Sequence, residues 1–174
     1  MKLGGLKPVD DRKVIERVLK GDAEAFNLLV RQWEKPIYNF IVRMIGDRDE
    51  AMDLCQDSFM KAYRELNTLK DRDRFSAWLY RIAHNTCFSK LRKDHGKTFV
   101  ELEPEMRASK PSIENRLAVE RALQQLPEDQ REVVVLKVFQ SLKFEEIAAI
   151  QGAPVSTVKS RLYMGFEKLR SILE

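Results

Sequence analysis

Cysteine and histidine are scarce in this 174-residue chain, which has two of each, and glycine and proline number only seven and six. Cys55 and Cys87 lie on stretches of apolar periodicity, so we expect reduced, buried thiols rather than a disulfide framework. His84 and Cys87 stand three residues apart, but two ligands do not make a metal site and no second pair accompanies them. The chain also has no Gly-rich phosphate loop, metal-type cluster or nucleophile–base pair. We therefore expect no metal, no cofactor and no catalysis.

Long apolar runs are absent as well. A membrane-spanning helix needs about 20 consecutive apolar residues, and no stretch of the sequence approaches this length. Residues 1–8 lack the apolar core of a secretory signal. We therefore expect no membrane insertion and a cytoplasmic protein.

Leu, Glu, Lys, Arg and Ala are abundant instead, which favours an all-α fold. Hydrophobic residues make up 44% of the chain, enough for packed cores, and charged residues make up 33%, which is high for a compact enzyme. The formal net charge of +4 is compatible with a nucleic-acid partner but does not establish one.

Apolar periodicity predicts two small helical domains joined by a flexible linker. In the first domain, residues 1–95, helices are expected at about 12–20, 22–45, 49–66 and 74–93. Pro36 should bend the second of these helices or divide it into two pieces. Residues 96–112 carry two prolines, mixed charges and no sustained period, which is typical of a linker. The second domain comprises residues 113–174.

The stretch 74–93 has two lines of side chains at helical spacing. One is apolar and should be buried: Phe75, Leu79, Ile82 and Thr86. The other, here called the basic–aromatic line, has Trp78 at its border with the apolar line and consists of Arg74, Arg81, Asn85, Phe88 and Arg92. Cations for phosphates, rings for unstacked bases and an amide for a base edge suit single-stranded nucleic acid. A core helix with a basic rim is the alternative for this stretch alone.

The helix expected at 49–66 carries an acidic strip on an exposed face: Glu50, Asp53, Gln56 and Asp57. Paired carboxylates perform general acid–base catalysis in some proteins, but no nucleophile or metal cluster accompanies these. From this segment alone, a docking surface for a basic partner and an ordinary solvated face fit the strip about equally well.

Residues 142–174 have the pattern of a helix-turn-helix. A short helix at 142–150 leads into a turn at 151–154 that contains Gly152, and a longer helix begins near Ser156. The first turns of the second helix enter the DNA major groove in that motif. Here they carry donors suited to base edges and phosphates: Thr157, Lys159, Ser160, Arg161 and Tyr163.

Three blocks of the chain resemble one known family. They are residues 53–64 (DLCQDSFMKAYR), residues 75–85 (FSAWLYRIAHN), and the group formed by 126–133 (LPEDQREV), 145–148 (EEIA) and 156–162 (STVKSRL). In this order they are similar to bacterial group-four σ factors of the σ70 superfamily, the extracytoplasmic-function type, over nearly the whole chain. The resemblance implies a promoter-specificity subunit, not an enzyme, that directs RNA polymerase core to promoters and initiates transcription.

The same resemblance implies partners and site residues. The partners would be the clamp helices of the largest polymerase subunit, promoter DNA and an anti-σ factor, with the protein at the nucleoid or held at the membrane by that factor. The acidic strip would dock on polymerase. Residues that match the capture and reading of a flipped minus-ten base are Asn67, Thr68, Leu69, Lys70 and Asn85, in agreement with the basic–aromatic line. The last helix matches the reader of the minus-thirty-five duplex, through Ser156, Thr157, Lys159, Ser160, Arg161, Tyr163 and Met164.

Two departures from the family pattern bear on DNA affinity. Many members carry an aromatic residue where Leu69 stands, and an aliphatic side chain should cap a base less well. Met164, Gly165 and Phe166 replace a frequent Arg-Ala-Arg, so two phosphate-binding cations are missing. Gly165 should also weaken the helix by up to about 1 kcal/mol relative to Ala. Binding to the minus-thirty-five duplex should therefore be weaker or differently specific.

Two rival functions come from other classes. A stand-alone helix-turn-helix regulator accounts for residues 113–174 but leaves the acidic strip and the basic–aromatic line unexplained. A small helical enzyme would use Glu50, Asp53 and His84, and the missing phosphate loop, metal cluster and nucleophile–base pair count against it.

Overall fold

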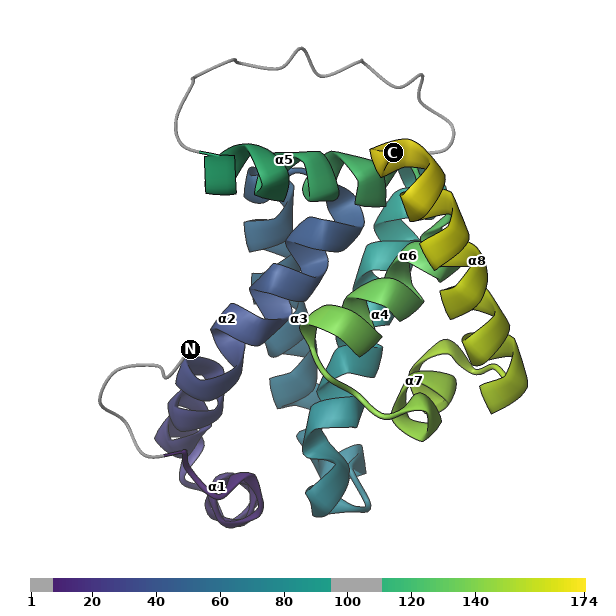
Figure 1. Ribbon diagram of the computed structural model, residues 1–174. Coiled ribbons are helices and arrows are strands. Elements are labelled where there is room, and N and C mark those ends of the chain that lie inside the picture. The colour runs from purple at the N-terminus through teal and green to yellow at the C-terminus, as the bar shows by residue number, and fades with distance from the viewer. Residues whose placement is uncertain (1–7, 95–110) are drawn as a thin grey trace.

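The computed structural model describes residues 8–94 and 111–174, and every regular element within these ranges is a helix (Figure 1). The predicted all-α fold is confirmed. The proposed linker, residues 96–112, lies outside the described residues except for its last two positions, which already belong to a helix.

The first half of the chain forms α1 (Asp11–Leu19), α2 (Phe26–Ile45), α3 (Arg48–Glu65) and α4 (Phe75–Asp94). Short 3-10 turns connect them: η1 (Ala23–Ala25), η2 (Leu66–Thr68) and η3 (Arg72–Arg74). Side-chain oxygens of Asp10, Asp22 and Asp47 accept backbone N–H groups at the starts of α1, η1 and α3. Gly46 ends α2 in the left-handed conformation, with φ at 85°. These capping residues explain why the helix boundaries follow the sequence pattern closely.

Helix α2 is continuous through Pro36, so the proline does not divide it, which was one of the two predicted outcomes. A proline inside a helix removes a hydrogen bond and costs about 3 kcal/mol. Burial offsets this cost, because Ile37, Phe40 and Ile41 just beyond the proline are fully buried. Each such side chain contributes about 1.5–3 kcal/mol relative to exposure.

The second half contains α5 (Pro111–Gln124), α6 (Glu128–Val134), the π-helical turn η4 (Val135–Phe139), α7 (Phe144–Gln151) and α8 (Val155–Leu173). Gly152 joins α7 to α8 with φ at 62°, a left-handed conformation that glycine adopts without strain. Helix α7, this turn and α8 form the predicted helix-turn-helix, and α6 packs against α8.

Gly165 faces inward on α8 and allows that helix to approach α6 closely. The residue is buried, and a Cβ atom at this position would lie 3.0 Å from Cγ2 of Val134. The expectation that Gly165 only weakens the helix is therefore incomplete, because the missing side chain also makes room for its neighbour.

Gly165→Ala should raise the free energy of unfolding by less than the roughly 1 kcal/mol by which Ala is favoured over Gly in a helix, because Val134 has to shift. In a Val134→Ala background the same substitution should recover most of that gain. Chemical denaturation of the four proteins measures the coupling energy between the two positions. Equal effects of Gly165→Ala in both backgrounds would contradict the tight contact.

The two predicted domains pack against each other around one continuous core, an arrangement here called the closed packing. Helix α7 lies beside α4, and α5 crosses the end of α2 (Figure 1). Side chains of each half form hydrogen bonds with residues of the other half. Nη1 of Arg131 donates to the carbonyl of Met44, Nε2 of Gln124 to that of Arg43 (2.8 Å), the Tyr80 hydroxyl to Oε1 of Gln140 (2.8 Å), and Nδ1 of His84 lies 2.6 Å from Oε1 of Glu132.

Candidate nucleic-acid interface

Helix α4 presents the two lines of side chains as the periodicity predicts. The apolar line is buried, with no member more than 7% exposed: Phe75, Leu79, Ile82 and Thr86. On the basic–aromatic line the exposed members are Arg74, Arg81, Asn85 and Arg92, and the half-buried ones are Trp78 and Phe88. The two rings are held by neighbours, since the Trp78 ring centroid lies 5.9 Å from that of Phe75. The Phe88 centroid lies 4.4 Å from that of His84. Cations, an amide and fixed rings therefore share one surface.

The loop before α4 lies at the N-terminal end of this line. Asn67, Thr68 and Lys70 are exposed, and the Thr68 hydroxyl donates to the carbonyl of Glu65 (2.7 Å). Leu69 differs, because its side chain is only 8% exposed and packs into the core. In this conformation Leu69 fixes the loop backbone and does not project as a cap for a base.

A cleft of about 420 Å³ separates this surface from α7. On the first half its lining includes Leu69, Arg74, Trp78 and Arg81, and on the second half Lys143, Glu145, Glu146, Ala149 and Ile150. Two carboxylates of α7 thus share the cleft with two cations of the basic–aromatic line. In the closed packing the second half covers part of the surface that a nucleic acid would need.

The acidic strip on α3 is exposed at Asp53, Gln56 and Asp57. Glu50 stands apart from them, because its Oε1 atom pairs with Nζ of Lys90 at 2.7 Å. This hydrogen bond is the main reason that the pKa of Lys90 is raised. Sequence reasoning missed the apolar side chains beside the strip: Met52, Met60 and Tyr63 are all about half exposed. Large apolar residues on a predicted solvent face were the signal for them.

Helix α8 presents most of its predicted DNA contacts to solvent. Ser156, Lys159, Ser160, Tyr163 and Met164 are exposed, and Thr157 is half-buried. Arg161 is different, since its Nε atom pairs with Oδ2 of Asp129 and its Nη1 atom donates to Oε1 of Gln151, both at 2.9 Å. The Arg161 side chain therefore ties α8 to α6 and α7 within the helix-turn-helix.

Sequence reasoning also missed a cluster of polar side chains around Glu132, whose side chain is fully buried. Its two carboxylate oxygens meet His84 of α4 and Nε2 of Gln151, at 2.6 and 2.9 Å. Arg131 and Glu132 end the polar run 128–132 directly before the apolar run 133–136, so the sequence carried no signal that these two side chains are buried. His84 therefore joins the two halves.

The remaining candidates for chemistry lie in the core. Burial raises the pKa of the Cys55 thiol to about 11 and also raises the pKa of Cys87. Neither thiol ionises near neutral pH, so neither acts as a nucleophile there. Among the described residues no three His, Cys, Asp or Glu side chains come together as a metal site requires. None of the helices in this part of the chain is long and apolar enough to cross a membrane.

Two segments of the chain match known protein families. Residues 29–97 match the family described as Sigma-70 region 2, and residues 116–169 match the one described as Sigma-70, region 4. The first segment contains the acidic strip and the basic–aromatic line, and the second contains the helix-turn-helix. The order of the two matches agrees with the order of the two structural halves.

Similar proteins are found over almost the full length. The RNA polymerase sigma-H factor of Pseudomonas aeruginosa is 35% identical, with 94% of each chain covered. The ECF RNA polymerase sigma-E factor of Escherichia coli K12 is 36% identical, over 91% of this chain and 92% of that one. Among solved structures, the sigma factor RpoE in complex with the anti-sigma factor NepR, from Bartonella quintana, has a TM-score of 0.71 at 27% identity, over 85% of this chain and 96% of that one. CnrH in complex with the cytosolic domain of CnrY has a TM-score of 0.72 at 27% identity, over 94% and 96%.

Proposed function

The chain belongs to the σ70-type sigma factors of the extracytoplasmic-function group, and from this we propose how its surfaces share the work of promoter recognition. It is a promoter-specific initiation factor of RNA polymerase, and sigma factors are not enzymes. Two units make the contacts, residues 1–95 at the minus-ten element and residues 113–174 at the minus-thirty-five element. The observation that carries this division is the exposure of a basic–aromatic helix face in one half and a helix-turn-helix in the other.

At the minus-ten element the first unit captures melted bases. Asn67, Thr68 and Lys70 provide exposed polar groups in the loop before α4, and Asn85 provides an exposed amide on α4 itself. Flipping a base costs a few kcal/mol of stacking, which contacts to rings and phosphates offset. Arg74, Arg81 and Arg92 supply the phosphate contacts.

At the minus-thirty-five element the first turns of α8 enter the major groove. Lys159 contacts phosphate or a base edge, and the exposed Tyr163 and Met164 offer apolar surface suited to thymine methyl groups. Arg161 holds α8 in place through Asp129 and Gln151 and is not a main DNA-contacting residue. With Met164 in place of a cation, this contact depends less on salt than a cationic one would.

The acidic strip docks on RNA polymerase core at the clamp helices of its largest subunit. Asp53, Gln56 and Asp57 are exposed on one face of α3, and the half-exposed Met52 and Met60 extend that face. Carboxylates beside exposed apolar side chains suit a basic partner with an apolar centre. Glu50 is the weakest candidate of the strip, because Lys90 already pairs with it.

Charge reversal at Asp53 and Asp57 together should weaken binding to core polymerase by about tenfold or more, because two carboxylates that attract a basic surface are replaced by cations that repel it. Titration of core polymerase with fluorescently labelled protein measures the affinity. Glu24→Lys with Glu65→Lys is the control, since it makes the same change in net charge at exposed positions outside the strip. Unchanged affinity in a folded double variant would remove the strip from the docking surface.

Regulation by an anti-sigma factor is part of the same proposal. One of the similar solved structures is a sigma factor in complex with the anti-sigma factor NepR. A partner of this kind would cover the polymerase-docking face and keep the protein in the cytoplasm or near the membrane. Pull-downs from uninduced cells should return such a protein along with polymerase.

Run-off transcription tests the function as a whole. Core polymerase on a pool of genomic promoter fragments, with and without this protein, should give discrete transcripts only when the protein is present. Sequencing of their 5′ ends defines the shared minus-ten and minus-thirty-five elements. DNA binding without core polymerase, and no protein-dependent start sites, would favour a stand-alone helix-turn-helix regulator.

A further inference from the structure

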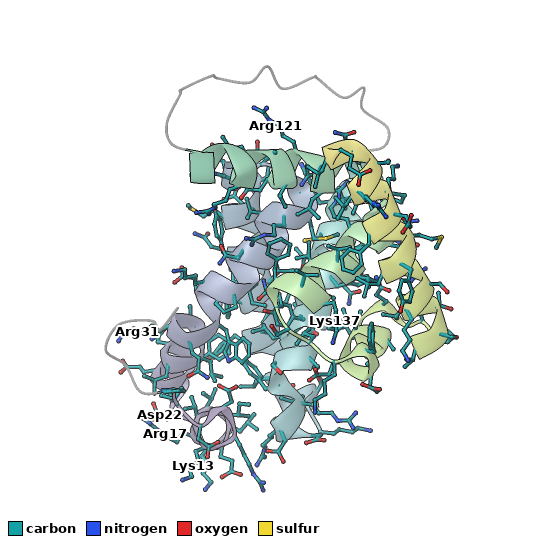
Figure 2. The ribbon with its side chains drawn as sticks, viewed as in Figure 1. Lys13, Arg17, Asp22, Arg31, Arg121 and Lys137 are labelled. Atoms are coloured by element: carbon teal, nitrogen blue, oxygen red, sulfur yellow. The ribbon has the colours of Figure 1, made fainter. Side chains whose placement is uncertain are left out.

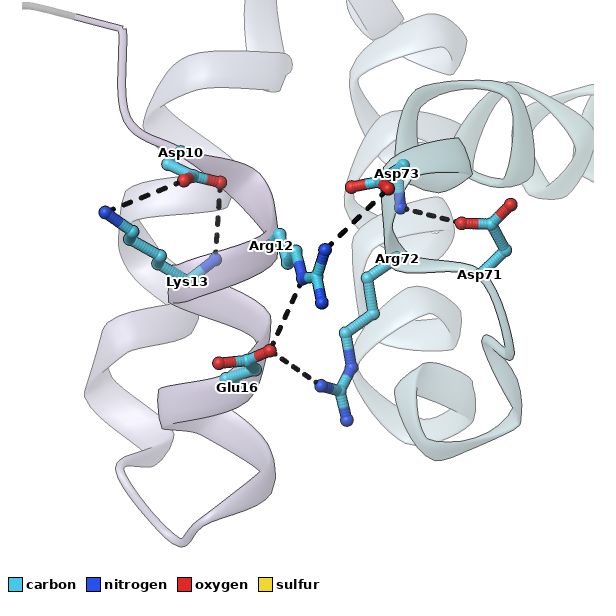
Figure 3. Close-up of polar contacts among 7 residues, drawn as sticks. All are labelled: Asp10, Arg12, Lys13, Glu16, Asp71, Arg72 and Asp73. Carbon is cyan, nitrogen blue, oxygen red and sulfur yellow. Dashed lines mark hydrogen bonds and ion pairs between the residues drawn. The ribbon is translucent and has the colours of Figure 1, made fainter.

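Helix α1 packs beside the loop that precedes α4. It contacts both short turns of that loop, η2 and η3. It also precedes the segment that matches Sigma-70 region 2, which begins at residue 29. The ion pairs between α1 and the loop are drawn in Figure 3.

One carboxylate of α1 lies at the centre of these contacts (Figure 3). Oε1 of Glu16 lies 2.9 Å from Nη1 of Arg72 in the loop and 3.6 Å from Nε of Arg12 on its own helix. Arg12 in turn reaches Oδ2 of Asp73 at 3.9 Å. The loop is thus held to α1 at two consecutive residues, immediately before Arg74.

Leu69 holds the middle of the loop in the core, but the polar side chains that follow it have few other partners. Asp71 accepts the backbone N–H of Asp73 at 3.1 Å and pairs with Nε of Arg74 at 3.3 Å, and both contacts lie within the loop. A segment held only by its own short-range contacts retains conformational entropy, which would be lost when DNA binds. The pairs to α1 are therefore the ion pairs that relate the second part of the loop, Arg72 and Asp73, to the rest of the fold.

Helix α1 itself is firmly anchored, which makes it a suitable support. Val14 and Ile15 are buried in the core. The Asp11 carboxylate accepts from Nε2 of Gln32 at 2.7 Å and from Nε1 of Trp33 at 3.1 Å, and both donors belong to α2. Desolvation by this packing is the main reason that the pKa of Asp11 is raised.

We propose that Glu16 is a positioning residue for base capture: through Arg72 and Arg12 it holds the loop of residues 67–74 in the conformation that accepts a melted minus-ten base. The proposal rests on the proposed function, because that function places the captured base at this loop. Glu16 touches no DNA. Its effect is to order the loop before DNA arrives, so that less freedom is lost on capture.

Glu16→Gln should slow open-complex formation by the assembled holoenzyme about two- to fivefold, the size expected for an ion pair that is one-third exposed. Binding to core polymerase and the Tm should stay unchanged, because exposed pairs contribute little to global stability. Glu16→Arg should have a larger effect, and Glu16→Arg combined with Arg72→Glu should restore the rate. Stopped-flow fluorescence from a reporter base in the minus-ten element measures opening.

Asp22→Asn is the matched control. It weakens an ion pair of similar geometry with Arg17, 2.7 Å between Nη2 and Oδ2, at the outer end of α1 (Figure 2). Asn also keeps the side-chain cap that Asp22 provides to η1. This variant should open promoters at the normal rate.

Promoters with single abasic sites across the minus-ten element separate positioning from a general structural role. At the captured position the difference between Glu16→Gln and the unaltered protein should vanish, since there is no base left for the loop to hold. A difference that persists at every abasic position, or a Tm that falls in parallel with the rate, would overturn the proposal. If Asn85→Ala leaves opening unchanged on the same templates, the proposed base capture fails as well. If Asn85→Ala slows opening and Glu16→Gln does not, only the positioning role fails.

Discussion

Arg131→Met should lower the free energy of unfolding by about 2–4 kcal/mol. The Arg131 side chain is almost completely buried, and its guanidinium donates to the carbonyls of Met44, Gln124 and Leu126. Methionine fills the space of the aliphatic stem but satisfies none of these oxygens, and a buried acceptor without a donor costs about 1–3 kcal/mol. Burial lowers the pKa of Arg131, so the charged group carries a desolvation cost of its own. Methionine does not carry this desolvation cost, which offsets part of the loss. The expected effect is therefore smaller than the summed cost of three unsatisfied carbonyl acceptors.

Chemical denaturation followed by circular dichroism measures this effect. Arg170→Met is the control, because Arg170 lies exposed on α8 in an ion pair with Glu174 and should contribute less than about 0.5 kcal/mol. A loss for Arg131→Met as small as that of the control would mean that the three carbonyls find other donors or water.

Asn85→Ala should reduce open-complex stability by about 1–3 kcal/mol, the usual size of a lost base contact. Asn85 is exposed on α4 between the half-buried His84 and the buried Thr86, so truncation removes the amide and leaves the helix packed. The loss should appear as relaxed preference at one melted base and not as uniform weakening. Open-complex lifetimes on promoters substituted at each minus-ten position measure both quantities.

Lys93→Ala provides the contrast, because Lys93 is an exposed cation at the end of the same helix without an assigned base. Any effect of that substitution should be equal on all sequences and should lower the salt slope of binding by about one. A uniform loss for Asn85→Ala would reassign its amide to the DNA backbone.

Local pattern was enough to predict the helices and the helix-turn-helix. Aspartate caps and a left-handed glycine mark helix ends wherever they occur, and Gly152 does so between α7 and α8. Most boundaries moved by only one or two residues, with α5 beginning at Pro111 and α8 at Val155, but α2 begins at Phe26 and not near residue 22, because the 3-10 turn η1 precedes it. The family resemblance is confirmed over both halves.

Residue type alone was a poorer guide to which side chains are free. Leu69 stands at a position that the family resemblance assigns to base capture, and Arg161 has the right chemistry for phosphate contact, yet the first packs into the core and the second pairs with Asp129. Such partners lie on other helices, and spacing along one helix does not reveal them. The closed packing was missed for the same reason, since the contact between His84 and Glu132 spans 48 positions of sequence.

The closed packing places a geometric condition on promoter contact. Elements about 25 base pairs apart lie roughly 85 Å apart along B-DNA, at about 3.4 Å per base pair. A compact chain of this length measures roughly 40 Å across. On the proposed function, one chain that touches both elements has to separate α4 from α7 and give up the contact between His84 and Glu132. The affinity of the free protein for a promoter is then lowered by the fraction of molecules that are open, and a partner that binds only the open form raises it. Core polymerase would thereby act as an allosteric activator of DNA binding as well as the enzyme being directed.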